Sequence, residues 1–250
     1  MQNGKSSARW AGCERARARP RHFTVSAGDA TRLPTVGDPA VFVLANTLLL
    51  PVPMVPEIAL HVAAEAVPLW SKTEDELSEI GLPPPFWAFA WAGGQALARY
   101  ILDHPADVAG KTVIDLASGS GLVAIAAMKA GASRVIAYDI DGFSRAAIAL
   151  NARANNVMVE VSGDDLLASA AAPSAATILA GDIFYERDTA ARAFAFLAGR
   201  AAHGALVLIG DPGRSYLPKD KLRKLAEYQV PVTRDLEDAD IKNTAVWTVA

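Results

Sequence analysis

The sequence predicts an α/β protein built on an open, doubly wound sheet of seven mostly parallel strands, preceded by a helical lead-in. Two observations support this prediction. From residue 112 onward, short apolar runs of strand length alternate with longer segments in which apolar residues recur at helical spacing. Within this region, the apolar run 112–116 is followed by the glycine turn Ser118-Gly-Ser-Gly121 and a helical segment, which is the order of a nucleotide-binding βαβ unit.

Length and composition indicate one domain with a tail. The 250 residues, of which 52% are hydrophobic, suffice for a full core. We expect a single domain over 38–250, with a lead-in over 38–111 and a cofactor-binding core over 112–250. A net charge of −3 gives no case for nucleic acid binding, and Cys13 as the single cysteine excludes a disulfide framework. The four histidines are scattered, so we expect no metal site. We also expect the protein to be a monomer.

Residues 1–37 hold seven basic residues against two acidic ones. This composition is typical of a transit peptide, of a disordered tail, or of translated sequence upstream of the true start. We favour the latter two, which predict a cytoplasmic protein, whereas a transit peptide would direct it to the mitochondrial matrix. The apolar stretch 41–60 is broken by Pro51, Pro53 and Pro56, so we expect no membrane span.

The lead-in contains candidate helices and one aromatic stretch. Residues 40–50 suit a strand or a short helix, 51–56 an extended chain, 56–67 a helix with proline at its start, and 73–79 a capped acidic helix. Phe86–Trp91 holds four aromatic residues, and Gly93 and Gly94 open a helix that ends near Asp103. The aromatic side chains either pack in the core or form a wall for an adenine ring or a lysine. We place Trp87 and Gly93 beside the cofactor.

The core elements follow in regular order. We expect strands at 112–117, 134–139, 157–161, 177–181, 204–210, 227–233 and 243–249, the last two as a hairpin. Helices are expected at 120–130, 144–155, 188–201 and 218–226, with a loop or short helix over 168–176 and an acidic turn over 235–240.

The glycine turn accommodates two classes of cofactor. Gly119 and Gly121 let the backbone approach a ligand, and Asp139, 20 residues after Gly119, can accept hydrogen bonds from ribose hydroxyls. Gly119-x-Gly121-x-x-Ala124 also matches the loose NAD pattern. Asp115, four residues before Gly119, repels a pyrophosphate but attracts the ammonium and sulfonium of S-adenosylmethionine (SAM). The turn therefore favours SAM over NAD, with a ligand-free turn as a third interpretation.

Further residues complete the predicted SAM site. Ala117 and Ile140 flank the two turns, and Asp164 follows the third strand, where it can accept from the adenine amino group. A solvated helix cap is the alternative role for Asp164. Because ligands bind at the carboxyl ends of the strands of such sheets, we expect these residues to line one rim together with Asp182.

The motif Asp182-x-x-Tyr185 follows the fourth strand, beside the expected sulfonium. Methyl transfer to an amine requires a neutral nitrogen held in line. A lysine of pKa about 10.4 costs roughly 4.6 kcal/mol to deprotonate at pH 7, and a neighbouring carboxylate opposes that loss. We therefore expect Asp182 to capture and orient a lysine rather than act as a strong base, and Tyr185 to orient the amine. A helix N-cap is the alternative role for Asp182.

Asp211-Pro-Gly-Arg214 follows the fifth strand and predicts a turn from which Arg214 projects. Arg214 can pair with Asp182 or Asp211, or bind an acidic substrate. A turn held by a surface ion pair is the structural alternative.

Several motifs resemble one enzyme family. They are Leu50-Pro-Val-Pro-x-Val-Pro-Glu57, Pro85-Phe-Trp-Ala-Phe-Ala-Trp-x-Gly-Gly-Gln-Ala-Leu97, Asp115-Leu-Ala-Ser-Gly-Ser-Gly121, Gly181-Asp-Ile-Phe-Tyr185, Gly210-Asp-Pro-Gly-Arg214 and Val246-Trp247. From Asp38 onward the chain is similar to the lysine methyltransferases of the electron transfer flavoprotein β-subunit, within the Rossmann-like seven-β-strand SAM methyltransferases. Ser118 stands where the first family motif usually has glycine.

The resemblance implies that Asp115, Gly119, Gly121 and Asp139 hold SAM, and that Asp182 and Tyr185 face the lysine. It implies the β-subunit of electron transfer flavoprotein as the protein substrate. The alternatives on the same sequence are a methyltransferase for a ribosomal protein or a small molecule, an NAD(P)-binding oxidoreductase, and a SAM-fold binding module without activity.

Overall fold

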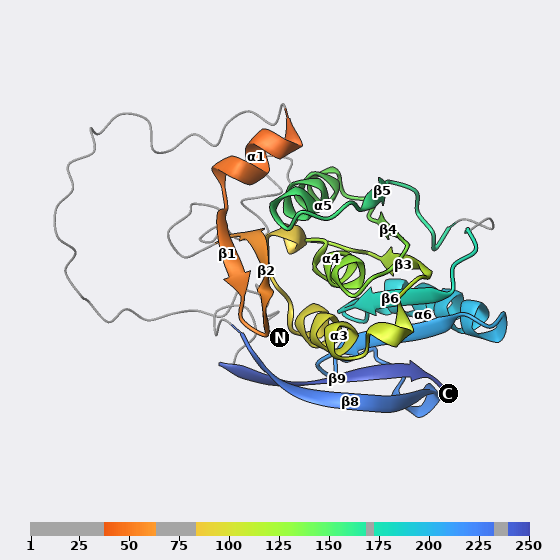
Figure 1. Cartoon of the computed structure of the whole chain (residues 1–250). Helices are drawn as coiled ribbons and strands as arrows, with labels where there is room; N and C mark the ends of the chain where they lie inside the picture. The colour runs from red at the N-terminus through yellow and green to blue at the C-terminus, as the bar shows by residue number, and fades with distance from the viewer. Residues whose placement is uncertain (1–37, 64–83, 169–172, 233–239) are drawn as a thin grey trace, which may run out of the picture.

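The computed structural model describes residues 38–63, 84–168, 173–232 and 240–250. Its centre is a seven-stranded sheet in the order β5-β4-β3-β6-β7-β9-β8 (Figure 1). The strands from β5 to β7 are parallel, and β9 is antiparallel to both of its neighbours. The predicted doubly wound, mostly parallel sheet with a terminal hairpin is therefore confirmed.

The elements of this sheet alternate along the chain. They are β3 (Thr112–Leu116), α4 (Leu122–Lys129), β4 (Arg134–Tyr138), α5 (Gly142–Ala154), β5 (Glu160–Ser162), β6 (Thr177–Gly181), α6 (Arg187–Ala202), β7 (Leu206–Asp211), the short 3₁₀ helix η4 (Lys219–Lys221), β8 (Leu222–Pro231) and β9 (Ile241–Val249). The central strands β3 and β6 are buried on both faces, as their continuous apolar sequences require in a parallel sheet.

Two apolar cores cover the two faces of the sheet. One core joins α3 (Ala92–Asp103), whose bounds match the prediction, to α4 and includes Leu97, Val113 and Leu179. The other core lies under α6 and includes Ile114, Ile178 and Leu197. Residues that are adjacent in a strand thus pack into opposite cores, because successive side chains of a strand alternate between its faces.

A predicted helix over 218–226 is wrong, because the chain there forms η4 and then β8. Its sequence, Leu222-Arg-Lys-Leu-Ala-Glu-Tyr228, has good helical propensity. The pairing of β8 with β9, which extends from Leu222 opposite Val249 to Pro231 opposite Ile241, overrides that propensity. The hairpin itself was expected, but its first strand begins five residues earlier than predicted.

The predicted helix over 56–67 is also wrong in its described part. Residues Val55–Val62 form β2, which pairs antiparallel with β1 (Leu48–Val52). The side chains of Asn151 in α5 and of Asn155, its C-cap residue, hold β2 in this extended form. Asn155 Oδ1 accepts from Ala59 N (3.0 Å) while Asn155 Nδ2 donates to Ala59 O (2.6 Å), and Asn151 Oδ1 accepts from His61 N (2.7 Å).

The rest of the lead-in combines both expected forms. Residues 40–50, for which a strand or a helix was expected, contain α1 (Pro39–Ala45) and the start of β1. The described residues before α3 therefore form a helix, a hairpin and the short 3₁₀ helix η2 (Phe86–Ala88). The expectations for 1–37 and 73–79, and the acidic turn expected over 235–240 except for its last residue, lie outside the described residues. Among the described helices, none has the length and apolar character needed to cross a membrane.

Candidate active site

The turn after β3 has an unusual backbone. Ala117 (φ 52°), Gly119 (φ 56°) and Gly121 (φ 82°) all lie in the left-handed region. That conformation is costly for Ala117, and such strain tends to be kept at functional sites. A Cβ added at Gly119 would meet no atom within 4 Å, so the space over that residue is open. Gly121 is the N-cap residue of α4, so the helix begins directly after this turn and its first amides have no partner within the helix.

Asp139 connects the end of β4 to this turn. Its Oδ2 accepts from Gly119 N (2.8 Å) and its Oδ1 accepts from Asp141 N (3.0 Å), while burial raises the pKa of the carboxyl. The next residue, Ile140, is 71% exposed. Asp164 lies beyond the end of the neighbouring strand β5 and is exposed, with Oδ2 accepting from Ser162 Oγ (2.8 Å). The predicted rim therefore has carboxylates that can accept from ribose hydroxyls and an exposed apolar side chain, that of Ile140, which can pack against an adenine ring.

Asp115 lies beneath the turn, not at its surface. It is 1% exposed, and its Oδ2 accepts from Ser118 Oγ (2.5 Å) and from Ala124 N (3.1 Å). Burial raises the pKa of this carboxyl to about 7, and the two hydrogen bonds oppose the rise. A cation held in the turn would favour the charged form of Asp115, whereas a phosphate would not. With the open space over Gly119, this donor and acceptor set suits SAM.

Trp87 does not belong to this rim. It is 1% exposed and its ring stacks on that of Phe143 (centroids 6.3 Å apart, 18° between planes) in a cluster that includes Phe42. Of the two roles considered for the aromatic stretch, Trp87 therefore has the structural one. Its placement beside the cofactor is corrected here, because the fully buried ring has no surface to offer a ligand.

Two other residues of the same stretch reach the site. Phe86 is 36% exposed, and its ring lies 5.3 Å from that of Tyr185 and 6.1 Å from that of Trp91. Trp91 Nε1 also donates to Phe86 O (2.8 Å). Phe86 and Trp91 thus form an aromatic wall with Tyr185, which is 50% exposed. The aromatic composition indicated such a wall, but the sequence did not identify which rings face outward.

Asp182 holds together three parts of the site. Its Oδ2 accepts from Gly94 N (2.7 Å), and its Oδ1 accepts from Arg214 Nη2 (2.7 Å) and Nε (3.2 Å). A Cβ on Gly93 would lie 2.6 Å from Asp182 Oδ2, so only glycine fits there. Burial raises the pKa of Asp182, and the Arg214 guanidinium opposes that rise. Asp182 does not cap α6, because Glu186 does so by accepting from the amides of Asp188 and Thr189.

The turn after β7 presents Arg214 to Asp182. Asp211 Oδ1 accepts from Gly213 N (2.6 Å) and from Arg214 N (2.7 Å), which fixes the turn. Burial raises the pKa of Asp211 to about 6. The guanidinium carbon of Arg214 lies 5.7 Å from the centre of the Trp91 ring. Of the two carboxylates considered from the sequence, Asp182 forms the ion pair with the side chain of Arg214. Asp211 instead accepts from the backbone amide of Arg214.

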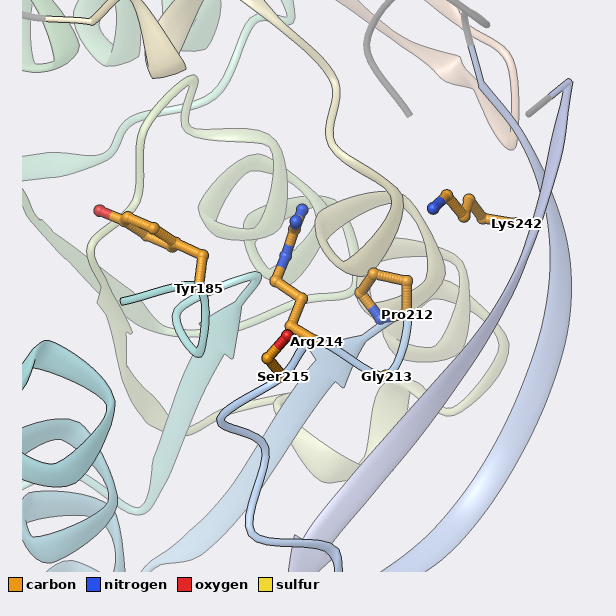
Figure 2. A pocket seen from close by; sticks show the side chains of 6 residues that line it. All are labelled: Tyr185, Pro212, Gly213, Arg214, Ser215 and Lys242. Atoms are coloured by element: carbon orange, nitrogen blue, oxygen red, sulfur yellow. The ribbon is translucent and has the colours of Figure 1, made fainter. Parts of the chain in front are cut away.

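A hollow of about 220 Å³ opens beside this pair (Figure 2). Its lining residues are Tyr185, Pro212, Gly213, Arg214, Ser215 and Lys242. In Figure 2, Tyr185 and Lys242 lie on opposite sides with Arg214 between them. Lys242, on β9, is a site residue that the sequence did not indicate, because no motif connects it to the turns. Within the described part of the chain, no group of three His, Cys, Asp or Glu side chains is placed to hold a metal ion.

Comparisons with known proteins agree with this geometry. A family model described as ribosomal protein L11 methyltransferase matches residues 96–192. The electron transfer flavoprotein beta subunit lysine methyltransferase of Mus musculus is 37% identical over 199 residues, which cover 78% of this chain and 77% of the mouse protein. The Xenopus laevis protein of the same name is 35% identical over 216 residues, covering 84% and 86%.

Among solved structures, a ribosomal protein L11 methylase from Lactobacillus delbrueckii subsp. bulgaricus matches with a TM-score of 0.44 and 22% identity. The match covers 63% of this chain and 78% of the other. The family assignment rests on the sequence relatives, whose similarity extends over more than three quarters of both chains. The protein therefore belongs to the electron transfer flavoprotein β-subunit lysine methyltransferase family, as its motifs predicted.

Proposed function

We propose that this protein transfers methyl groups from SAM to lysine side chains of the β-subunit of an electron transfer flavoprotein. The proposal is carried by one observation: Asp182, the partner of Arg214, binds the first turn of α3 at the point where that turn packs on the start of α4, directly after the glycine turn. A Cβ on Gly94, whose amide binds Asp182, would be 3.8 Å from Leu122, the first residue of α4. The candidate lysine site and the candidate SAM site therefore share the N-termini of α3 and α4.

SAM, when bound, supplies an electrophilic methyl group on a sulfonium. Asp115 and Asp139 would hold the cofactor, with Ile140 covering one face of its adenine ring. The aromatic wall of Phe86, Trp91 and Tyr185 attracts the lysine ammonium through cation–π contacts and excludes water from it. The Tyr185 hydroxyl orients the amine after its proton is lost.

The surroundings of Asp182 refine its expected role. Both carboxylate oxygens already accept hydrogen bonds, from Gly94 and from Arg214. The Arg214 charge balances that of Asp182, so the pair does not hold the lysine in its protonated form. In this proposal Asp182 has a positioning role: it holds Arg214 and the first turn of α3 in place beside the lysine site.

Purified protein, SAM carrying a labelled methyl group and purified flavoprotein test the proposal, with mass spectrometry of the flavoprotein lysines as the readout. We expect methylation of the β-subunit, and no label on that subunit would contradict the proposal. Asp182→Asn should lower kcat at least tenfold, because an amide cannot accept from Gly94 and Arg214 with both of its polar atoms. Asp188→Asn, an exposed carboxylate in the first turn of α6, is the matched control.

The match to the L11 methyltransferase model favours a second candidate, methylation of a ribosomal protein. The same assay with purified ribosomal proteins distinguishes the two substrates. That the protein acts as a monomer in the cytoplasm, without nucleic acid, stays a prediction. Size-exclusion chromatography with light scattering checks the first part of it.

A further inference from the structure

The side chain of Asn151 connects the glycine turn to the lead-in, and the proposed reaction gives it no role. Asn151 lies in α5 and is fully buried. Its Nδ2 donates to the carbonyl oxygen of Ser120 in the glycine turn (2.8 Å), and its Oδ1 accepts from the backbone amide of His61 in β2 (2.7 Å). Both ends of the side-chain amide are therefore engaged, each by the backbone of a different segment.

The carbonyl of Ser120 depends on this donor. In a helix that begins at Leu122, the carbonyl at position 120 would otherwise accept from the amide of Ala124, four residues later. The Ala124 amide instead donates to Asp115 Oδ2 (3.1 Å), and Ser120 is only 6% exposed. A buried carbonyl without a donor costs roughly 1–3 kcal/mol. Asn151 Nδ2 therefore stabilises the turn at a point that neither α4 nor solvent can satisfy.

The turn needs support from outside because part of its backbone is in a costly conformation. Ala117, at its start, has a φ of 52°, which a residue with a Cβ keeps only where the surrounding structure fixes it. Helix α5 provides contacts at two positions one helical turn apart. A Cβ on Gly121 would be 3.3 Å from the Cα of Ile148, and Asn151 binds the preceding residue of the turn. The packing of α5 thus restricts where the turn can lie.

The orientation of the Asn151 amide is fixed from the other side by β2. The backbone N–H of His61 can only donate and the carbonyl of Ser120 can only accept, so one orientation of the amide satisfies both. Asn155, the C-cap residue of α5, anchors the same strand by binding both the amide and the carbonyl of Ala59. The donor that reaches the glycine turn is therefore held in a single position.

We propose that Asn151 is a positioning residue of the SAM site. It holds the carbonyl of Ser120, and with it the backbone of the glycine turn, in the form that receives the cofactor. Because its side chain is fully buried, Asn151 acts through the turn and not by touching the cofactor. The inference deepens the cofactor-binding part of the proposed function and rests on it.

Calorimetry of SAM binding tests the inference with Asn151→Asp at about pH 8, where the new carboxyl is ionised. A carboxylate keeps the acceptor for His61 N, but its second oxygen cannot donate to the Ser120 carbonyl and repels it. We expect the Kd for SAM to rise about tenfold or more. In steady-state kinetics the KM for SAM should rise with it, while the kcat and the KM for the flavoprotein stay within about twofold of wild type.

Asn155→Asp is the matched control, with the same substitution at the end of the same helix and against the same strand. Its carboxylate would lose the donor to the carbonyls of Ala59 and Asn151, so thermal unfolding should show a loss of stability in both variants. None of the described hydrogen bonds of Asn155 reaches the glycine turn. Its Kd for SAM should therefore stay within about threefold of wild type. Equal Kd values in the two variants would overturn the inference.

A measurement on the wild type tests the same contact without a substitution, and it decides the question if Asn151→Asp does not fold. Because coupling between two sites is reciprocal, saturating SAM should slow hydrogen exchange at the His61 amide, which binds Asn151, by about fivefold or more. The Ala59 amide, which binds Asn155, is the internal reference and should change less. The same change at both amides would contradict the inference.

The outcomes separate the two proposals. If wild type binds SAM and Asn151→Asp folds with an unchanged Kd, the inference is wrong and the proposed function stands. If the Kd rises in Asn151→Asp alone but wild type transfers no methyl group to the flavoprotein, the inference stands and the proposed substrate is wrong. If wild type binds no SAM, both fail.

Discussion

Single residues in this protein have roles set by their burial as much as by their chemistry. The sequence predicts both Ile140 and Trp87 beside the cofactor, but Ile140 is 71% exposed whereas Trp87 is 1% exposed. Ile140 has a surface for a ring, whereas Trp87 stabilises the core between α1 and α5. Asp115 shows the same principle for a charged group, because its burial makes ionisation costly until a cation arrives.

Ile140→Ala should weaken SAM binding without destabilising the protein. Loss of about three carbon atoms of contact with the adenine ring corresponds to a roughly three- to tenfold rise in Kd. Isothermal titration calorimetry measures the Kd, and thermal unfolding should show an unchanged Tm. Met158→Ala removes a side chain that is 87% exposed and serves as the control. An unchanged Kd for Ile140→Ala would show that Ile140 does not contact the cofactor.

Asp115 should make the protein without cofactor less stable as pH rises. Its folded pKa of about 7 lies above the ordinary value of 3.8. The folded state therefore binds more protons than the unfolded state between these values, and stability falls across that window. Asp115→Asn abolishes this titration, so its free energy of unfolding relative to wild type should rise between pH 5 and pH 8, by about 2–4 kcal/mol.

Urea unfolding of both proteins at a series of pH values measures this difference. The comparison with wild type cancels the contributions of Asp139, Asp182 and Asp211, whose pKa values burial also raises. A difference that stays flat from pH 5 to pH 8 would contradict the raised pKa of the buried Asp115.

At the scale of the elements, the site depends on how closely α3 approaches the carboxyl ends of β6 and β7. Gly93 is in contact with Gly210 of β7, and a Cβ on either one would clash with the backbone carbonyl of the other. The first turn of α3 can therefore reach Asp182, which follows β6. Packing between these elements brings the Asp182 motif to the glycine turn.

Gly93→Ala and Gly94→Ala test this packing as a pair. The new Cβ at Gly93 would clash with Gly210 O and Asp182, so we expect a loss of about 2 kcal/mol or more in stability together with a loss of activity. A Cβ at Gly94 meets nothing closer than 3.8 Å, and alanine gains up to about 1 kcal/mol in a helix. Chemical unfolding measures both, and equal effects would refute the close approach.

For the molecule as a whole, the sheet separates a cofactor-binding half from a hairpin half. Asp115, Asp139 and Asp164 lie at the carboxyl ends of β3, β4 and β5, while Lys242 lies on the added strand β9. The hollow forms where the segments that follow β6 and β7 face β9. The proposed substrate site therefore combines residues from β6, β7 and β9, which are neighbours in the sheet but not in the chain.

Deleting residues 1–37 should leave SAM binding unchanged, because the residues of the predicted SAM site lie between 87 and 182. We expect a Kd within about twofold of the full chain, well below the tenfold that 1.4 kcal/mol represents. Calorimetry on both chains measures it. A loss of affinity of tenfold or more would show that the tail contributes to the cofactor site.

The sequence alone determined the parallel sheet, the glycine turn and the carboxylates at the strand ends. These features depend on local apolar runs, on residues that tolerate positive φ and on spacing, all of which are encoded within short segments. The tertiary structure decided the form of 55–62 and 222–231, where pairing with a distant strand overrides helical propensity. It also decided that Trp87 is buried, that Asp182 pairs with Arg214 and that Lys242 reaches the hollow. Those outcomes depend on contacts between residues far apart in the chain, and no local pattern records them.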